Sequence, residues 1–277
     1  MGMIVITGAA RGIGAACARA LAGRAPLLIA DLRSDALEQE AASLRTQGHE
    51  VETCVGDFVA DGMVEALAQR AAEAGGCEGL VHAAGLSPEM GDARRIFEVN
   101  LFASATLVDA LEPHLKPGAA GVLIASQAAE LLAGGLSAEQ EALLEAPFAA
   151  DAYERLVDAC GALASEPQGA YGLTKRGVQL LAISRAPAWG ARGGRLVSLS
   201  PGIIDTDMGE IEFAAREATM QAIVDHTPVG GRRGRADEIA AVAAFLLSDA
   251  ASFVSGSDIL VDGGSTYQIL RGPGLPG

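Results

Sequence analysis

Tyr171 and Lys175, the ends of the stretch "YGLTK", are the residues whose types and spacing most clearly suggest chemistry. Residues four apart on a helix project from one face, so the lysine ammonium would stabilise a phenolate and lower the pKa of the tyrosine. The chain has three tyrosines and two lysines, so chance predicts such a pair roughly 0.02 times. The pattern predicts Tyr171 as a general acid and base.

Ser126 ends the apolar stretch "GVLIAS", where its hydroxyl would hydrogen-bond a substrate oxygen as charge develops on it. Between Ser126 and Tyr171 lie two segments with the pattern of amphipathic helices, 137–146 and 149–166, the first with Ser137 and Gln140 at the positions of a capping box. We therefore expect an ordered helical insert at about 128–168. Because it begins beside the serine and ends at the tyrosine, we expect it to border the substrate mouth.

The stretch "TGAARGIG", residues 7–14, lies between a predicted strand and a predicted helix. Glycines at such a turn let the backbone approach a pyrophosphate, which the free amides and the positive helix end would hold. The sequence therefore predicts a dinucleotide site here. The turn residues expected to contact the dinucleotide are Gly8, Arg11, Gly12, Ile13 and Gly14.

Asp31 ends the second predicted strand, where a carboxylate accepts both ribose hydroxyls of NAD and repels the additional phosphate of NADP. Arg11 and Arg33 argue for NADP, because either guanidinium would pair with that phosphate. We predict NAD, with NADP as the alternative. Asp57, followed by Phe58, ends the third strand and is placed to meet the adenine amino group; its alternative role is to cap the next helix.

Short apolar segments alternate with longer segments of helical period along the whole chain. Seven strands are expected, most of them apolar on both faces, at 3–7, 26–31, 51–57, 79–85, 121–126, 194–202 and 258–264. This order predicts one doubly wound α/β domain, a parallel sheet with helices on both faces. It spans 1–277 and has a loose tail at 271–277. The segment 237–249 predicts a core or subunit-interface helix.

The composition excludes several classes of protein. A net charge of −15 disfavours nucleic acid as a partner. Four scattered cysteines and four histidines without a metal-binding spacing indicate buried thiols and no metal site. No apolar run is long enough to span a membrane and the start has no basic leader, so we expect no membrane association and a cytoplasmic location.

Taken together, these motifs resemble those of the short-chain dehydrogenase/reductase family over nearly the whole chain. The resemblance rests on "TGAARGIG", Asp31, Asp57, "HAAG" (82–85), "VN" (99–100), Ser126, "YGLTK", "PGIIDTDM" (201–208) and "DGG" (262–264). It implies that Asn100 supports a water relay to Lys175. It also implies cofactor contacts from Ala84, Gly85, Tyr171, Lys175, Pro201, Gly202, Ile204 and Thr206.

Two features depart from the usual family pattern. The family usually has asparagine where this chain has His82, so the sheet contact made there is in question, and we interpret His82 as structural. The serine usually precedes the tyrosine by about a dozen residues, whereas 44 residues lie between them here. A similarly long insert, together with "LVHAAGLSP", resembles the bacterial 3α-hydroxysteroid dehydrogenase/carbonyl reductase branch.

The segment 205–227 predicts a lid over a hydrophobic substrate, since it carries five large apolar residues and six acids but one cation, Arg216. A neutral alicyclic or steroid-like alcohol or ketone suits it better than a 3-oxoacyl thioester on a phosphate-bearing carrier, which is the alternative. The insert lies near helices that many family members use to form tetramers, so we expect a homodimer. A non-catalytic NAD-binding regulatory protein is disfavoured because Tyr171 and Lys175 are both present. A serine hydrolase is disfavoured because there is no GxSxG elbow.

Overall fold

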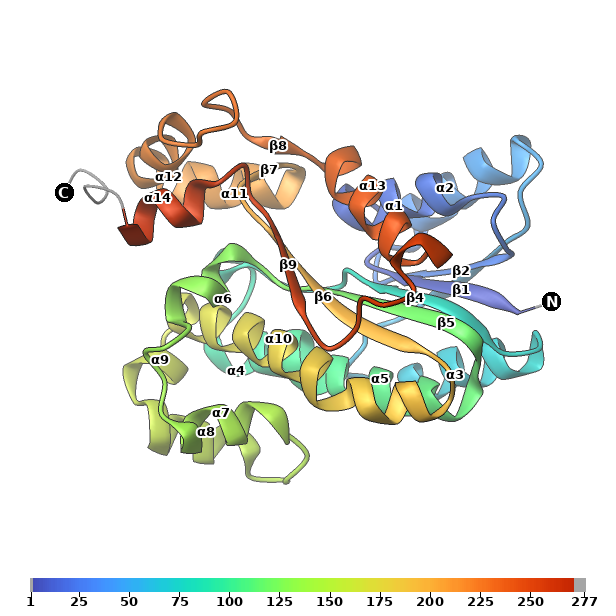
Figure 1. Ribbon diagram of the computed structural model, residues 1–277, viewed down its shortest axis with the longest axis horizontal. Coiled ribbons are helices and arrows are strands. Elements are labelled where there is room, and N and C mark those ends of the chain that lie inside the picture. Colours follow the sequence, from blue (N-terminus) through green and yellow to red (C-terminus); the bar gives the residue numbers. More distant parts are fainter. Residues whose placement is uncertain (1, 272–277) are drawn as a thin grey trace.

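The computed structural model describes residues 2–271 as a parallel β-sheet covered on both faces by helices (Figure 1). The sheet has seven strands in the order β3-β2-β1-β4-β5-β6-β9, all paired in parallel. Its strands are β1 (Met3–Thr7), β2 (Leu27–Asp31), β3 (Val51–Val55), β4 (Cys77–His82), β5 (Leu115–Ile124), β6 (Arg195–Pro201) and β9 (Asp258–Val261). The predicted doubly wound fold is confirmed.

The two faces of the sheet bury separate hydrophobic cores. One face is covered by α1 (Gly12–Leu21), α2 (Ser34–Thr46) and α13 (Ala236–Leu246). The other is covered by α3 (Met63–Glu73), α4 (Ala93–Phe97), the π-helix η2 (Glu98–Phe102), α5 (Ala103–Leu111) and α10 (Pro167–Ala191). Strands buried on both faces explain the continuous apolar runs in the sequence.

The insert, defined here as residues 127–166, is helical as expected. It consists of α6 (Gln127–Leu132), α7 (Ala138–Glu145), α8 (Ala152–Cys160) and α9 (Ala162–Ser165). The capping box between Ser137 and Gln140 is formed at the start of α7. The second predicted helix is divided at Gly161, whose φ of +56° is one that glycine adopts without steric cost.

The lid, defined here as residues 206–226, consists of α11 (Asp207–Ala215) and α12 (Glu217–Asp225). In Figure 1 the lid and the insert lie on opposite sides of the carboxyl edge of the sheet, the lid at the upper left and the insert at the lower left. The remaining elements are η1 (Pro88–Met90), η3 (Glu112–His114), η4 (Asp249–Ala251), the two-stranded pair β7 (Ile204–Asp205) and β8 (Gly234–Arg235), and α14 (Ser265–Arg271).

Several predicted boundaries were wrong: β3 ends at Val55, β4 spans Cys77–His82 and β9 ends at Val261, so each of these strands ends two or three residues earlier than predicted. Strand β5 begins at Leu115, six residues earlier than expected, because the preceding helix closes with a 3₁₀ turn at η3 and the chain enters the sheet directly. Arg271 belongs to α14, so a tail cannot begin there, and residues 272–277 lie outside the described residues. Among residues 2–271, no helix combines the length and apolarity needed to cross a membrane.

Candidate active site

Two adjoining cavities open at the carboxyl edge of the sheet, where loops after β1, β2, β4, β5 and β6 meet. The first, the nucleotide cavity, contains the glycine turn and Asp31. The second, the reacting cavity, contains Ser126, Tyr171 and Lys175. The two cavities share Ile13, Ala83, Gly85, Leu86, Thr206 and Met208. A ligand that filled both would reach from Asp31 to Tyr171.

The glycine turn forms the wall of the nucleotide cavity at the start of α1. Gly8 and Gly12 have φ of +66° and +57°, and a Cβ on Gly14 would lie 2.1 Å from the carbonyl oxygen of Gly8. Side chains are therefore excluded where the strand turns into the helix. No side chain within residues 2–271 caps α1, which leaves its first amides free for a phosphate. The turn fits a dinucleotide pyrophosphate.

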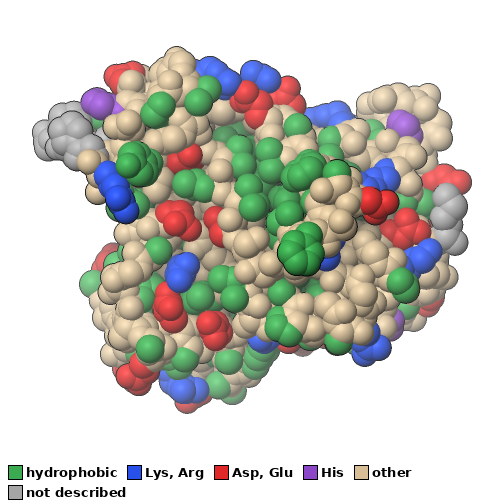
Figure 2. Space-filling model, viewed as in Figure 1, with side chains coloured by type: hydrophobic (Ala, Val, Ile, Leu, Met, Phe, Trp, Pro, Cys, Tyr) green, Lys and Arg blue, Asp and Glu red, His purple; other side chains and the backbone are tan. Residues whose placement is uncertain are grey.

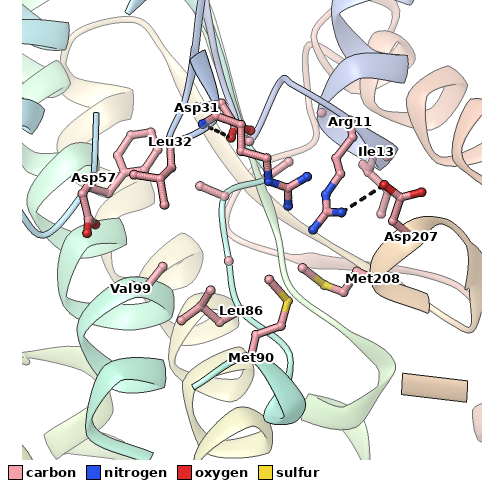
Figure 3. Close-up of a pocket in the computed structure, with 18 of the residues that line it drawn as sticks. Arg11, Ile13, Asp31, Leu32, Asp57, Leu86, Met90, Val99, Asp207 and Met208 are labelled. Carbon is pink, nitrogen blue, oxygen red and sulfur yellow. Dashed lines mark hydrogen bonds and ion pairs between the residues drawn. The ribbon is translucent and has the colours of Figure 1, made fainter. Parts of the chain in front are cut away.

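Asp31 lies at the end of β2 and lines the nucleotide cavity (Figure 3). Its carboxylate accepts hydrogen bonds from the amides of Ala10 at 3.1 Å and Arg33 at 3.0 Å. These bonds fix the carboxylate at the edge of the cavity. Arg11 points instead toward the lid, where it forms an ion pair of 3.0 Å with Asp207.

Asp57 and Phe58 also line the nucleotide cavity, but Asp57 has a partner that the sequence reasoning missed. Its Oδ2 pairs with Arg95 of α4, and its Oδ1 accepts from the amide of Val59. The alternative role of helix cap was wrong, because α3 begins only at Met63. An adenine amino group would have to share the Asp57 carboxylate with Arg95.

Ser126, Tyr171 and Lys175 meet in the reacting cavity although the insert separates them in sequence. Ser126 follows β5 and accepts a hydrogen bond of 3.2 Å from the amide of Ala128. Tyr171 and Lys175 lie on one face of α10, with the lysine Nζ 5.8 Å from the centre of the tyrosine ring. Lys175 is buried and donates to the carbonyl of Ile124 at 2.9 Å.

The pKa values of these two residues are set first by burial. Burial lowers the pKa of Lys175 to about 8. Burial also raises the pKa of Tyr171; the Glu212 carboxylate adds to this, and a hydrogen bond with Ser126 opposes it. The net shift that these groups give the tyrosine pKa is upward, because the phenol is removed from water when the chain folds. The lowering expected from Lys175 together with an oxidised nicotinamide stays a prediction.

Asn100 is buried in the π-helix η2 and holds the loop after β4. Its Oδ1 accepts from the amide of Leu86 at 2.7 Å, and its Nδ2 donates to the carbonyl of the same residue at 2.9 Å. A Cβ on Gly85 would lie 3.2 Å from Asn100 Oδ1 and 3.4 Å from Lys175 Nζ. The glycine thus keeps open the space between the two side chains. A water relay through that space stays a prediction.

His82 forms the middle of a buried chain of hydrogen bonds. Thr7 Oγ1 accepts from the amide of Ala84 at 3.3 Å and lies 2.7 Å from His82 Nδ1. His82 Nε2 lies 2.7 Å from Ser104 Oγ, which donates to the carbonyl of Asn100. Because both ends of the chain are fixed, as an amide donor and a carbonyl acceptor, the neutral Nε2–H tautomer satisfies every bond. Burial lowers the pKa of His82 to about 3, and the sheet contact in question is made.

The segment 201–206 borders the reacting cavity, and its contacts with a cofactor stay a prediction. Pro201, Gly202, Ile204 and Thr206 all line the reacting cavity, and Ala84 and Gly85 line the nucleotide cavity. The residue missed here is Glu212 of α11, which lines the reacting cavity beside Tyr171. Its spacing of four from Met208, another lining residue, was the available signal, because the two share one helix face.

The insert does not border these cavities, which corrects our expectation. No residue of 127–166 lines either cavity in the described part of the chain. Instead α7 and α9 pack on α10, and Arg176 of α10 pairs with Glu141 of α7 at 2.6 Å. The insert turns away from the mouth because its apolar side chains, Leu144, Leu156 and Ala164, join the core on the α10 face.

Comparison with known proteins agrees with this geometry. A family model described as short chain dehydrogenase matches residues 2–137, and one described as Enoyl-(Acyl carrier protein) reductase matches residues 157–266. The structure resembles that of a short-chain dehydrogenase/reductase (glucose/ribitol dehydrogenase) from Brucella melitensis, with a TM-score of 0.74 and 31% identity. The match covers 95% of this chain and 96% of that one.

Two curated relatives align along nearly their whole lengths. A 3-alpha-hydroxysteroid dehydrogenase/carbonyl reductase of Comamonas testosteroni is 34% identical, over 95% of this chain and 96% of the relative. A cis-4-hydroxycyclohexanecarboxylate dehydrogenase of Sinomonas cyclohexanicum is 31% identical, over 95% of each. With the sheet order, the glycine turn and the shared cavity of Ser126, Tyr171 and Lys175, these matches show that the chain belongs to the short-chain dehydrogenase/reductase family of oxidoreductases.

Proposed function

We propose that this protein is an NAD-dependent dehydrogenase that interconverts a secondary alcohol and a ketone on a hydrophobic, alicyclic or steroid-like substrate. The observation that carries the proposal is the continuity of the two cavities. A dinucleotide with its adenosine at Asp31 would extend toward the cavity that contains Ser126, Tyr171 and Lys175. Relatives that match over nearly the whole chain are named as dehydrogenases of ring alcohols.

Each residue of the reacting cavity has a role in this reaction. A dinucleotide held by the glycine turn and Asp31 would supply the hydride acceptor for oxidation of the alcohol and the hydride donor for reduction of the ketone. Tyr171 takes the hydroxyl proton during oxidation and gives it back during reduction. Ser126 donates a hydrogen bond to the substrate oxygen. Lys175 places positive charge near the Tyr171 ring and favours the phenolate, whereas burial raises the pKa of the phenol.

NAD is favoured over NADP by Asp31. Its carboxylate, fixed by two backbone amides, would accept the ribose hydroxyls and repel an additional phosphate. Arg33 lines the same cavity and is the group that would favour NADP, whereas Arg11 is already paired with Asp207. The preference for NAD follows because the fixed carboxylate of Asp31 shares the nucleotide cavity, among the described residues, with one guanidinium that has no ion pair, that of Arg33.

A homodimer is the assembly that we propose. Hydrophobic side chains gather over α13 and β9 on the face seen in Figure 2. Phe245 of α13 is 50% exposed, Phe253 before β9 is fully exposed, and Leu260 of β9 is 39% exposed. Exposed apolar groups on one face mark an interaction surface. Light scattering tests this proposal, and a tetramer with the insert outside its interfaces contradicts it.

We also propose a cytoplasmic location.

Absorbance at the reduced-nicotinamide band tests the activity. The purified protein is mixed with NAD or NADP and a panel of cyclic alcohols, steroids and 3-oxoacyl thioesters. We expect turnover of ring alcohols with NAD, and a decrease of about 100- to 10,000-fold in Tyr171→Phe with unchanged NAD affinity. Turnover retained in Tyr171→Phe would contradict the assignment of Tyr171. Thioester reduction alone would favour the acyl reductase, and NAD binding without any turnover would favour a regulatory protein.

A further inference from the structure

Glu212 is the one carboxylate side chain among the described residues that line the reacting cavity. It lies on α11 one turn after Met208, and both side chains face Ser126 and Tyr171. Glu212 is partly buried, but its Oε1 is wholly buried and has no hydrogen-bond partner within residues 2–271. Buried polar oxygens are rarely left unpaired, because each costs free energy. Oε2 has no hydrogen-bond partner among these residues either and is not wholly buried, so the carboxylate is placed for a partner that the described chain does not supply.

The charged groups around Glu212 do not use this oxygen. Lys175, the other charged residue of the cavity, donates to the carbonyl of Ile124. Helix α11 packs against η1 and brings Glu89 near, with Arg216 Nε at 3.7 Å from Glu89 Oε1. Arg216 Nε is also buried without a hydrogen-bond partner in the described chain. Among the described residues, the lining of the reacting cavity thus includes one carboxylate without a hydrogen bond, that of Glu212, while Arg216 and Glu89 lie outside this lining.

The surrounding charges indicate which chemical group fits. A substrate carboxylate would be repelled by Glu212 and Glu89. Lys175 and Arg216 already balance the negative charges of Glu212 and Glu89, so no net negative charge is left to favour a substrate ammonium. A hydroxyl group is neutral and donates one hydrogen bond, which the unpaired carboxylate of Glu212 can accept.

We propose that Glu212 is a substrate-binding residue that accepts a hydrogen bond from a second hydroxyl of the substrate, next to the carbon that reacts. The inference rests on the proposed function and narrows it: the preferred substrates are alicyclic diols rather than the corresponding mono-alcohols. In this proposal Met208 and Leu86 contact the substrate ring, and Glu212 accepts a hydrogen bond from the substrate hydroxyl on the neighbouring carbon. An analogue without that hydroxyl leaves the buried oxygen unpaired and binds less well.

The test compares cyclohexanol with cis- and trans-1,2-cyclohexanediol as substrates of the NAD-loaded protein. We expect kcat/KM for one diol isomer to exceed that for cyclohexanol by about tenfold or more. Glu212→Leu should reduce this ratio to about one; the readout is the ratio of the two substrates within each variant, because removing Glu212 also changes the surroundings of Tyr171. Glu212→Gln, which keeps an acceptor oxygen, should retain part of the preference. Glu217→Gln, an exposed substitution on the same lid, is the matched control.

A binding measurement separates this inference from the proposed function. Calorimetry on the NAD complex of Tyr171→Phe measures affinity for the diol and for cyclohexanol without turnover. The proposal predicts tighter binding of one diol isomer, lost on the further change Glu212→Leu. An unchanged diol preference in Glu212→Leu, in either measurement, overturns it. If the wild type oxidises no alcohol, the proposed function fails and the binding ratio alone decides the role of Glu212.

Discussion

The insert and the lid are both helical segments between strands of the same sheet, but they differ in how their side chains are buried and paired. In the insert, Leu144, Leu156 and Ala164 are fully buried and Glu141 pairs with Arg176. In the lid, α11 has no fully buried residue, while Glu212 and Arg216 hold buried polar atoms without partners in the described chain.

This difference separates a structural part of the molecule from one that faces a ligand. The insert is the longer and more unusual segment in the sequence, but its groups are paired within the chain and it packs on α10. The lid carries unpaired groups, Glu212 in the lining of the reacting cavity and Arg216 outside it. Unpaired buried groups are costly and persist where a ligand completes them. We therefore expect changes in the insert to alter stability and changes in the lid to alter specificity.

The largest effect is expected for Leu156→Ala in the insert. The substitution leaves a cavity in the core shared with α10 and should lower the free energy of unfolding by about 2–4 kcal/mol. Denaturant titration measures the change. Leu163→Ala, at a position 40% exposed in the same insert, is the control and should cost much less. A change in substrate preference among folded Leu156→Ala protein would contradict the separation of the two regions.

A smaller effect is expected from the titration of Glu212 in the lid. Burial and the neighbouring Glu89 raise its pKa from 4.5 to about 7, against Arg216 and Lys175. The folded state therefore binds the Glu212 proton more tightly than the unfolded state does. The contribution of Glu212 to the free energy of unfolding is thus most favourable below pH 4.5 and falls as the pH rises from 4.5 to 7. Relative to Glu212→Gln, the wild type should lose roughly 1–2 kcal/mol between pH 5 and pH 8, after allowance for solvent screening. Parallel pH dependence in the two proteins would show that Glu212 is not buried as described.

The smallest effects distinguish the ion pairs of the two regions. Arg176→Ala removes a partly buried pair with Glu141 and should cost about 1 kcal/mol or less. Asp207→Asn breaks the pair between Arg11 and the lid, where Asp207 is 67% exposed, and should cost less than about 0.5 kcal/mol. Thermal unfolding of the two variants under one set of conditions measures both. An equal or reversed order would contradict the tighter attachment of the insert.

Much of the fold was predictable because its signals are local. Apolar runs predicted the strands, and the glycines after β1 predicted the turn into α1. Ser137 and Gln140 predicted the start of α7. The direction of the insert was not predictable, because it depends on which surface Leu144 and Leu156 meet after folding. The upward shift that burial gives the pKa of Tyr171 was also not predictable, since the spacing to Lys175 is visible in the sequence and the burial of the phenol is not.

The hydrogen-bond chain through His82 has a consequence for how the active site responds to acidity. With a pKa of about 3, the imidazole stays neutral throughout the range in which Glu212 gains or loses its proton. The end of β1, the end of β4 and the π-helix η2 that contains Asn100 are therefore linked by hydrogen bonds that no physiological change of pH reverses. The hydrogen-bonded residues on which the dinucleotide would rest therefore keep their charge state as the pH changes. The lid carries Glu212, whose charge changes with pH.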